Sequence, residues 1–121
     1  MAHTILIADD HVEMRELVVQ LLGAQGYDIR EAADTDGVLA QIRTERPDLL
    51  ILDVNMPGDG GIAALKSIRQ NHTLNGMRIL VLSGSVELTP EWLSGLGADA
   101  QLPKPFPIDE LNATVRQLLP G

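Results

Sequence analysis

Short apolar runs alternate with helical patterns along the whole chain, and this alternation restricts the fold more than any other feature. Continuous apolar runs occur at residues 5–8, 49–52 and 79–82. Apolar residues at helical spacing follow each run, and glycine or proline separates successive units. Two weaker strand patterns, at residues 27–32 and 100–102, complete a series of five strand–helix units. Such a series predicts an α/β fold, in which right-handed crossovers join a parallel sheet with helices on both faces.

The composition of the runs indicates where each strand lies in the sheet. The first, third and fourth runs are apolar throughout, which is typical of strands buried on both faces. Residues 27–32 alternate in polarity, and the fifth run is short and contains Pro103, so we expect these two strands at the edges. Helix starts are also indicated: Thr89 as an N-cap before Pro90, and Pro107 before the last helix.

Composition excludes several classes of protein. The 121 residues, 45% of them hydrophobic, predict one domain over residues 1–121 and contain no apolar run of bilayer length. The first apolar run leads directly into Asp9 and Asp10 instead of a signal-peptide core, so we expect a cytoplasmic protein without membrane association. The absence of cysteine excludes disulfides and thiolate metal sites. A net charge of −8 argues against direct binding to nucleic acid.

Polar residues follow four of the five predicted strands. Asp9 and Asp10 follow the first strand, Asp53 ends the third, Ser83 ends the fourth and Lys104 follows the fifth. Because ligands of open parallel sheets bind at the carboxyl ends of the strands, we expect these side chains to lie together. Two carboxylates ~4 Å apart repel each other by about 4 kcal/mol at an effective dielectric constant of 20, so a cation should bind there. A site with oxygen donors and neither cysteine nor histidine favours Mg²⁺ over zinc.

Taken singly, each of these residues has an ordinary structural explanation. An aspartate pair commonly caps a helix, a serine commonly stabilises a turn, and a lysine is commonly a surface charge. The combination is informative because the residues follow different strands that meet at one edge of the sheet. The three histidines are weaker candidates: His11 is next to the acid pair, whereas His3 and His72 have no such neighbours, and we interpret all three as surface residues.

The arrangement resembles the receiver domain of two-component response regulators over essentially the whole chain. The matching segments are ILIADD at residues 5–10, LDVNMP at 52–57 with Gly61, VLSG at 81–84, and GAD at 97–99 leading to KPF at 104–106. The resemblance implies a flavodoxin-like (βα)5 fold, a doubly wound five-stranded parallel sheet in the order 2-1-3-4-5, in agreement with the edge strands expected above.

The resemblance also implies a role for each site residue. Asp53 would be the phosphoacceptor, and Asp10, Asp53 and the backbone carbonyl of Asn55 would hold Mg²⁺, with Asp9 assisting through water. Lys104 would pair with Asp53 and then with the phosphoryl oxygens, and Ser83 would hydrogen-bond the attached phosphoryl group. These roles suit phosphoryl transfer, which needs an in-line carboxylate nucleophile and cations around the equatorial oxygens. In the family the bond before Pro105 is usually cis.

The implied function is signalling, not enzymatic turnover. The phosphoryl donor would be a histidine kinase or a histidine phosphotransfer protein. A downstream protein or output domain would bind the face formed by the fourth helix, fifth strand and fifth helix, and Trp92 belongs to that fourth helix. The chain departs from the family at Gln101, where receivers often carry a switching tyrosine or phenylalanine.

Three other functions remain as alternatives. A phosphatase of the haloacid-dehalogenase type would have a second aspartate two residues after the nucleophile, but that position is Asn55. A flavodoxin-like redox carrier would need a phosphate loop after the first strand, where Asp9 and Asp10 would repel phosphate. A pseudo-receiver that acts only as an interaction scaffold is disfavoured because all five site residues are retained.

Overall fold

The structure, a computed structural model, describes residues 3–56, 60–74, 76–84 and 89–120 of the chain. The strands are β1 (Thr4–Ala8), β2 (Asp28–Ala32), β3 (Leu49–Asp53), β4 (Arg78–Ser83) and β5 (Ala100–Pro103). The helices are α1 (Val12–Gly23), α2 (Thr35–Thr44), α3 (Gly60–Gln70), α4 (Pro90–Gly95) and α5 (Ile108–Leu118), with a short 3-10 turn at His72–Leu74. All strand pairs are parallel and the order is β2-β1-β3-β4-β5, which confirms the predicted fold class.

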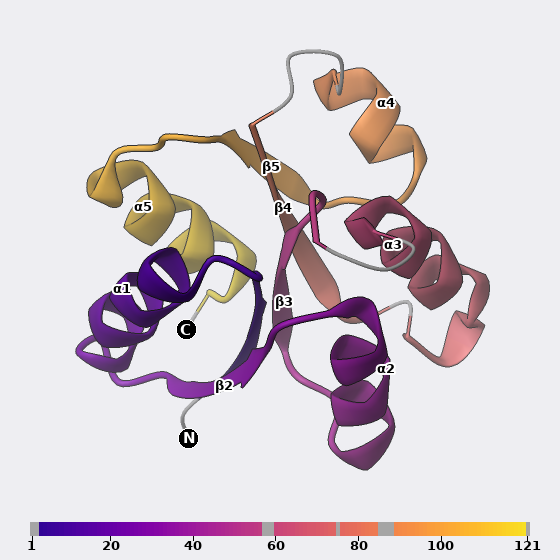
Figure 1. Cartoon of the computed structure of the whole chain (residues 1–121), viewed down its shortest axis with the longest axis horizontal. Helices are drawn as coiled ribbons and strands as arrows, with labels where there is room; N and C mark the ends of the chain where they lie inside the picture. The colour runs from indigo at the N-terminus through magenta and orange to yellow at the C-terminus, as the bar shows by residue number, and fades with distance from the viewer. Residues whose placement is uncertain (1–2, 57–59, 75, 85–88, 121) are drawn as a thin grey trace.

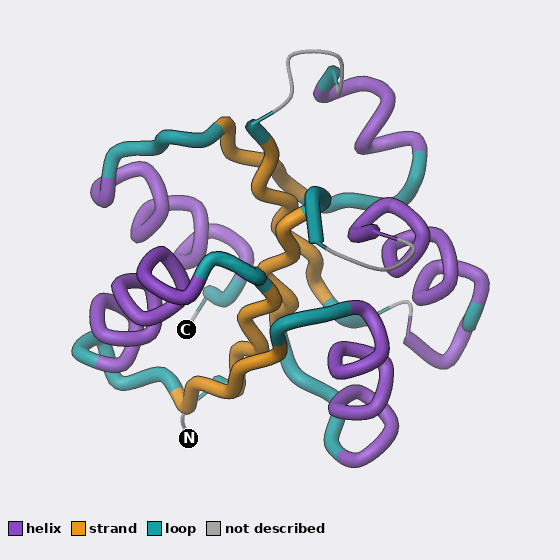
Figure 2. Tube along the Cα trace, in the orientation of Figure 1, coloured by secondary structure: helices purple, strands orange, loops and turns teal. Residues whose placement is uncertain are grey.

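The sheet lies between two layers of helices. Figure 1 shows α1 and α5 on one side and α2, α3 and α4 on the other, and Figure 2 shows the strands as the middle layer. Alternate residues of one strand point to opposite faces, so Leu50 and Leu52 of β3 pack under one layer and Leu49 and Ile51 under the other. Strand β3 is buried along its whole length, whereas β2 and β5 are only partly buried, as predicted for edge strands.

The structure confirms the two helix starts predicted from the sequence. The Thr89 side chain accepts a hydrogen bond from the Trp92 amide, and α5 begins directly after Pro107. Helical spacing did not show which residues face the core: Leu17 of α1 is 44% exposed, and Leu118 of α5 is only partly buried. Residues 57–59, which include the end of the matching segment at 52–57, lie outside the described residues, and α3 begins at Gly60.

Parallel strands give the molecule two unlike ends. We call the carboxyl rim the residues at the carboxyl ends of the strands: 9–10, 53–55, 83 and 104. We call the amino rim the residues before the strands begin: 3, 46–48, 76–78 and 97–99. Within the described ranges, no helix is long and apolar enough to cross a membrane.

Candidate functional site

Three carboxylates meet at the carboxyl rim. Asp9 and Asp10 follow β1, and Asp53 is the last residue of the adjacent strand β3. One oxygen from each carboxylate lies within 4.8 Å of the other two. Asp9 and Asp53 are 1% and 2% exposed, whereas Asp10 is exposed. The structure therefore brings together the acids that the sequence analysis expected at one edge.

Lys104 is the cation of this cluster. Its Nζ lies 3.0 Å from Oδ2 of Asp9 and 3.3 Å from Oδ2 of Asp53. The pairing of β4 with β5 positions it, because the Lys104 amide donates a 2.8 Å hydrogen bond to the Ser83 carbonyl. The peptide bond between Lys104 and Pro105 is cis. The contact with Asp53 agrees with the sequence interpretation, whereas the shorter contact with Asp9 was not predicted.

The side chain of Asp53 is held from a second direction. Its Oδ1 accepts a 3.0 Å hydrogen bond from the Asn55 amide. The strand register sets Asp53 opposite Leu82, so Ser83 lies one residue beyond it on β4, where Ser83 is 6% exposed. The hydroxyl-bearing residue is thus next to the strand end that carries Asp53. The side chain of Asn55 is exposed, so its backbone and not its side chain contacts this carboxylate.

The ionised form of Asp53 is destabilised where it stands. Burial, the largest effect, raises the pKa of Asp53 above its ordinary value of 3.8. The Asn55 amide and the Lys104 ammonium oppose this rise, and the charge of Asp9 adds to it. One lysine therefore does not compensate the carboxylates, and an additional cation at the rim would lower the electrostatic energy.

Gly61 packs directly behind the Asp53 backbone. A Cβ at this position would lie 2.4 Å from the Asp53 carbonyl oxygen and 2.4 Å from the Val54 Cα. The Gly61 amide donates a 3.1 Å hydrogen bond to the Val54 carbonyl, which holds the start of α3 against the end of β3. Only glycine fits this close approach of two backbones.

The donors at the carboxyl rim suit a hard divalent cation. They are carboxylate oxygens, and no histidine belongs to the cluster found in the described ranges. Mg²⁺ binds through one or two carboxylates and keeps several waters, which is compatible with an exposed Asp10 beside two buried acids. Zinc sites usually include histidine or cysteine. The residues present therefore fit Mg²⁺.

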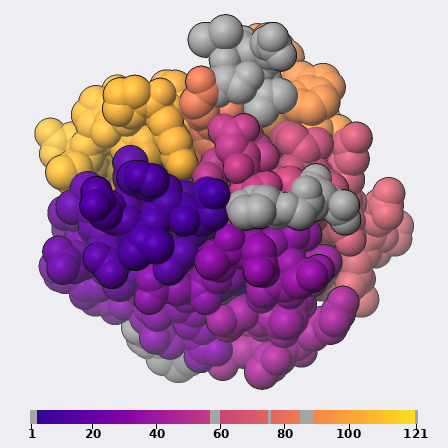
Figure 3. Space-filling model, in the orientation of Figure 1, coloured from indigo at the N-terminus to yellow at the C-terminus, as the bar shows by residue number. Residues whose placement is uncertain are grey.

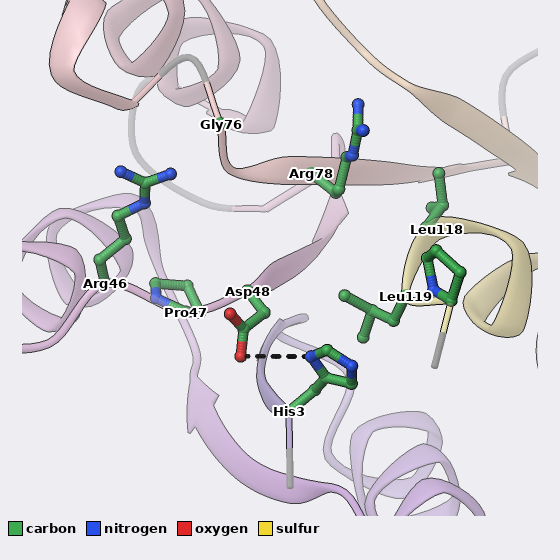
Figure 4. Close-up of a pocket in the computed structure, with 9 residues that line it drawn as sticks. His3, Arg46, Pro47, Asp48, Gly76, Arg78, Leu118 and Leu119 are labelled. Atoms are coloured by element: carbon green, nitrogen blue, oxygen red, sulfur yellow. Dashed lines mark ion pairs between the residues drawn. The ribbon is translucent and has the colours of Figure 1, made fainter. Parts of the chain in front are cut away.

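The amino rim contains a cavity of about 400 Å³, but its charged groups are already satisfied. Figure 4 shows His3 facing Asp48, with His3 Nδ1 and Asp48 Oδ2 3.8 Å apart. Arg46, on another wall, donates a 3.0 Å hydrogen bond to the Thr73 carbonyl. Among the described residues, the cluster of carboxylates lies at the carboxyl rim and not at this end. We therefore assign the candidate site to the carboxyl rim.

Two polar residues outside the predicted set are organised by the structure. Arg15 of α1 donates a 2.7 Å hydrogen bond from Nη1 to the Asp9 carbonyl. In the sequence, Arg15 is marked only by its place five residues after Asp10, and this spacing does not indicate the contact. Gln101 lies on β5 beside Val81 of β4.

Of the three histidines, His11 and His72 are exposed as expected.

Comparison with known proteins gives a consistent result. A profile of the response regulator receiver domain matches residues 5–116. The response regulator MprA of Mycobacterium bovis is 39% identical over 121 residues, an alignment covering 98% of this chain and 51% of MprA. The chain thus spans about half the length of the curated relatives it matches.

Solved structures show the same similarity. The chemotaxis response regulator CheY4 of Vibrio cholerae has a TM-score of 0.90 and 29% identity, with 98% of this chain and 99% of that chain covered. The receiver domain of a Francisella response regulator has a TM-score of 0.86 and 33% identity, with 96% and 95% covered.

Proposed function

This chain belongs to the response regulator receiver domain family, and we propose that it acts as a phosphoacceptor in a two-component phosphorelay. The phosphoryl group comes from a phosphohistidine of a histidine kinase or a histidine phosphotransfer protein. An oxygen of Asp53 forms the new O–P bond while the P–N bond of the donor breaks. The electron pair of the P–N bond returns to the imidazole nitrogen. The observation that carries the proposal is the position of Asp53, buried at the end of the central strand beside Asp9 and Lys104.

Asn55 orients the nucleophile, and Lys104 and Ser83 contact the phosphoryl group. The Asn55 amide fixes one oxygen of the Asp53 carboxylate, which orients the nucleophile for in-line attack. Lys104, which contacts Asp53 before transfer, moves its charge-assisted hydrogen bonds to the phosphoryl oxygens after transfer. Ser83, at the end of the adjacent strand, donates its hydroxyl hydrogen to another of these oxygens. The only other proposed step is autodephosphorylation: water attacks the phosphorus, the bond from Asp53 to phosphorus breaks, and inorganic phosphate leaves.

Asp10, Asp53 and the Asn55 carbonyl are the proposed ligands of Mg²⁺, and Asp9 contacts it through water. The all-oxygen cluster and the raised pKa of the buried Asp53 support this set. Bound Mg²⁺ supplies positive charge to the oxygens of the transferring phosphoryl group. Lys104 already occupies one oxygen of Asp9, which is consistent with an indirect role for that acid.

Phosphorylation with acetyl phosphate tests the proposed acceptor. We expect Mg²⁺-dependent addition of one phosphoryl group, lost after chelation and in Asp53→Ala, when the protein is measured by intact-mass spectrometry. Asp48→Ala is the matched control, because it removes a carboxylate from the amino rim, and it should be labelled normally. Equal labelling of Asp53→Ala and wild type would contradict the proposal.

An exposed apolar surface beside the carboxyl rim is the proposed docking site of the phosphoryl donor. Val12 and Leu17 of α1 are 51% and 44% exposed, and Ile108 of α5 is 43% exposed. The surfaces of α1 and α5 adjoin in Figure 3. If the donor protein binds here, Leu17→Glu should slow phosphoryl transfer from a kinase and leave labelling by acetyl phosphate unchanged. Unchanged transfer from the kinase would place docking elsewhere, and equal slowing with both donors would show that the substitution disturbs the site itself.

The opposite side of α5 is the proposed output surface. A groove of about 380 Å³ separates α4 from α5 and is lined by Pro90, Ser94, Ala98, Asp99, Ala100, Gln101, Thr114 and Gln117. Its hydroxyl and amide groups suit a polar partner segment, from a downstream protein or an output domain. Trp92, 43% exposed on α4, reports on this surface.

Trp92 fluorescence tests whether the site communicates with the output surface. Beryllofluoride with Mg²⁺, a mimic of the phosphoryl group, should change Trp92 emission, whereas Mg²⁺ alone should change it little. Unchanged emission with a modified Asp53 would mean that the signal leaves by another surface.

A further inference from the structure

Asp10 is the least constrained acid of the carboxyl rim. Its side chain is exposed, and no hydrogen bond or ion pair joins it to another residue of the described part of the chain. One of its carboxylate oxygens nevertheless lies within 4.8 Å of those of Asp9 and Asp53. The place of this carboxylate is therefore set by its backbone, and above all by the peptide that joins Asp9 to Asp10.

Arg15 holds that peptide by its oxygen. Its Nη1 donates a 2.7 Å hydrogen bond to the Asp9 carbonyl, which belongs to the peptide group between Asp9 and Asp10. Its Nε donates a 3.0 Å hydrogen bond to Oε1 of Glu31 on β2. The Arg15 side chain is 17% exposed and that of Glu31 is 46% exposed. The guanidinium thus bridges strand β2 and the backbone of the metal-binding loop.

The other polar atoms of Asp9 are also engaged. Its amide donates a 3.2 Å hydrogen bond to the Ala32 carbonyl of β2. Its Oδ1 accepts a 2.9 Å hydrogen bond from the His11 amide, and its Oδ2 contacts Lys104. Among the described residues, however, Arg15 alone donates to the carbonyl that precedes Asp10. Removing it would let this peptide rotate while Asp9 stays anchored.

We propose that Arg15, oriented by Glu31, is a positioning residue that fixes the Asp9–Asp10 peptide so that the Asp10 carboxylate stands ready for Mg²⁺. The proposal rests on the proposed function, because it assumes Mg²⁺ at the carboxyl rim. Groups that orient metal ligands commonly change metal affinity about 10- to 100-fold when removed.

The charge of Arg15 alone would have the opposite effect. A guanidinium near the acids repels a divalent cation, so its removal would strengthen Mg²⁺ binding if charge were its only contribution. Loss of positioning weakens binding. The two explanations therefore predict opposite signs in the same variant.

Calorimetric titration with Mg²⁺ separates them. We expect affinity about tenfold lower in Arg15→Met and in Arg15→Lys, because neither side chain can contact the Asp9 carbonyl and Glu31 in the same geometry. Arg30→Met is the matched control: it removes an equal charge from β2, where Arg30 pairs with Glu45 at 2.6 Å away from the Asp9 carbonyl, and it should bind normally. Glu31→Gln retains an acceptor for Nε and should bind Mg²⁺ nearly as wild type.

Labelling by acetyl phosphate over a range of Mg²⁺ concentrations provides a second measurement. Weaker positioning raises the Mg²⁺ concentration needed for half-maximal rate and leaves the rate at saturation close to that of wild type. General damage to the fold would instead lower the rate at every concentration and overturn the proposal, as would unchanged or stronger Mg²⁺ binding in both Arg15 variants. A wild-type protein that binds no Mg²⁺ would overturn the proposed function itself, whereas normal wild-type binding with normal Arg15 variants would overturn only the positioning role.

Discussion

The two rims of the sheet differ in how completely their charges are matched. At the carboxyl rim, Lys104 pairs with two of the three carboxylates, those of Asp9 and Asp53, and the pKa of the buried Asp53 is raised. At the amino rim, Arg69 forms a 2.9 Å ion pair with Asp99. The same guanidinium donates to three backbone carbonyls, those of Gly97, Leu74 and Met77. The carboxyl rim therefore has more negative than positive charge, whereas Arg69 and Asp99 at the amino rim compensate each other.

The two ends of the sheet therefore differ in role: contacts at the amino rim stabilise the fold, and the carboxyl rim carries the proposed binding site. Arg69, a partly buried side chain of α3, joins α3 to the segments before β4 and β5 through its contacts with Met77, Gly97 and Asp99. The carboxylates of the carboxyl rim repel one another, and a bound cation, as proposed above, would relieve this repulsion. Violations of local electrostatic consistency are expected at functional sites.

Arg69→Met should have the greatest effect on stability. The Arg69 side chain is 16% exposed, and its loss removes the guanidinium from the Gly97 and Met77 carbonyls and from Asp99. Asp99 keeps the Ile79 amide as a donor, and the Leu74 carbonyl keeps the Met77 amide. Removal of one partner from such a network should cost about 3 kcal/mol, or roughly 10 °C in melting temperature for a domain of this size. Thermal unfolding followed by circular dichroism measures it. The control is Lys66→Met, an exposed residue of the same helix, and an equal loss in both variants would contradict the central role of Arg69.

Mg²⁺ should stabilise the protein through the carboxyl rim alone. At a concentration of 100 times the dissociation constant, a ligand of the folded state adds about 2.7 kcal/mol. We expect the melting temperature to rise accordingly with Mg²⁺ and to rise much less in Asp10→Asn, which removes a proposed ligand. An equal rise in Asp10→Asn would show that Mg²⁺ binds at another place.

Asp53→Asn should stabilise the metal-free protein in a pH-dependent manner. Because the pKa of Asp53 is raised above 3.8 on folding, the unfolded chain releases this proton first as pH rises. The contribution of Asp53 to the stability of wild type therefore falls as pH increases from about 4 through the folded-state pKa, by linkage. Asp53→Asn lacks this loss, so its advantage in melting temperature should grow over that interval and shrink when Mg²⁺ is added to wild type. A constant difference at all pH values would mean that Asp53 is not the group responsible.

Arg30→Met should change stability least. Its ion pair with Glu45 is short, at 2.6 Å, but the two side chains are 32% and 51% exposed. Pairs exposed to this extent contribute about 0–1 kcal/mol, so the melting temperature should move by only a few degrees. A loss comparable to that of Arg69→Met would show that pairing itself, and not burial, accounts for the stability of the amino rim.

The sequence predicted the fold and the acid cluster for the same physical reason. Strands such as residues 49–52 are apolar throughout because both faces are covered, and parallel strands bring their carboxyl ends to one edge. Asp53 and Lys104 could therefore be assigned to one site although they are far apart along the chain.

Contacts made by long side chains could not be predicted in this way. Arg15 and Arg69 reach across several elements, and nothing in residue spacing indicates where a guanidinium ends. The same limit applies to the contact between Lys104 and Asp9, which depends on rotamers. Periodicity also could not show that Leu17 faces solvent, because a helical pattern with apolar residues on two sides has more than one possible buried face.

Gly61 sets a boundary for engineering this protein. A library intended to change the specificity of the proposed docking surface can vary the exposed positions 12, 17 and 108, where new side chains extend into solvent. Position 61 has to stay constant, since a single methyl group there would lie 2.4 Å from the Asp53 carbonyl oxygen and displace the strand end that carries the proposed acceptor. Selection for a new partner can thus vary the exposed positions, while glycine is kept at position 61 so that the end of β3 is not displaced.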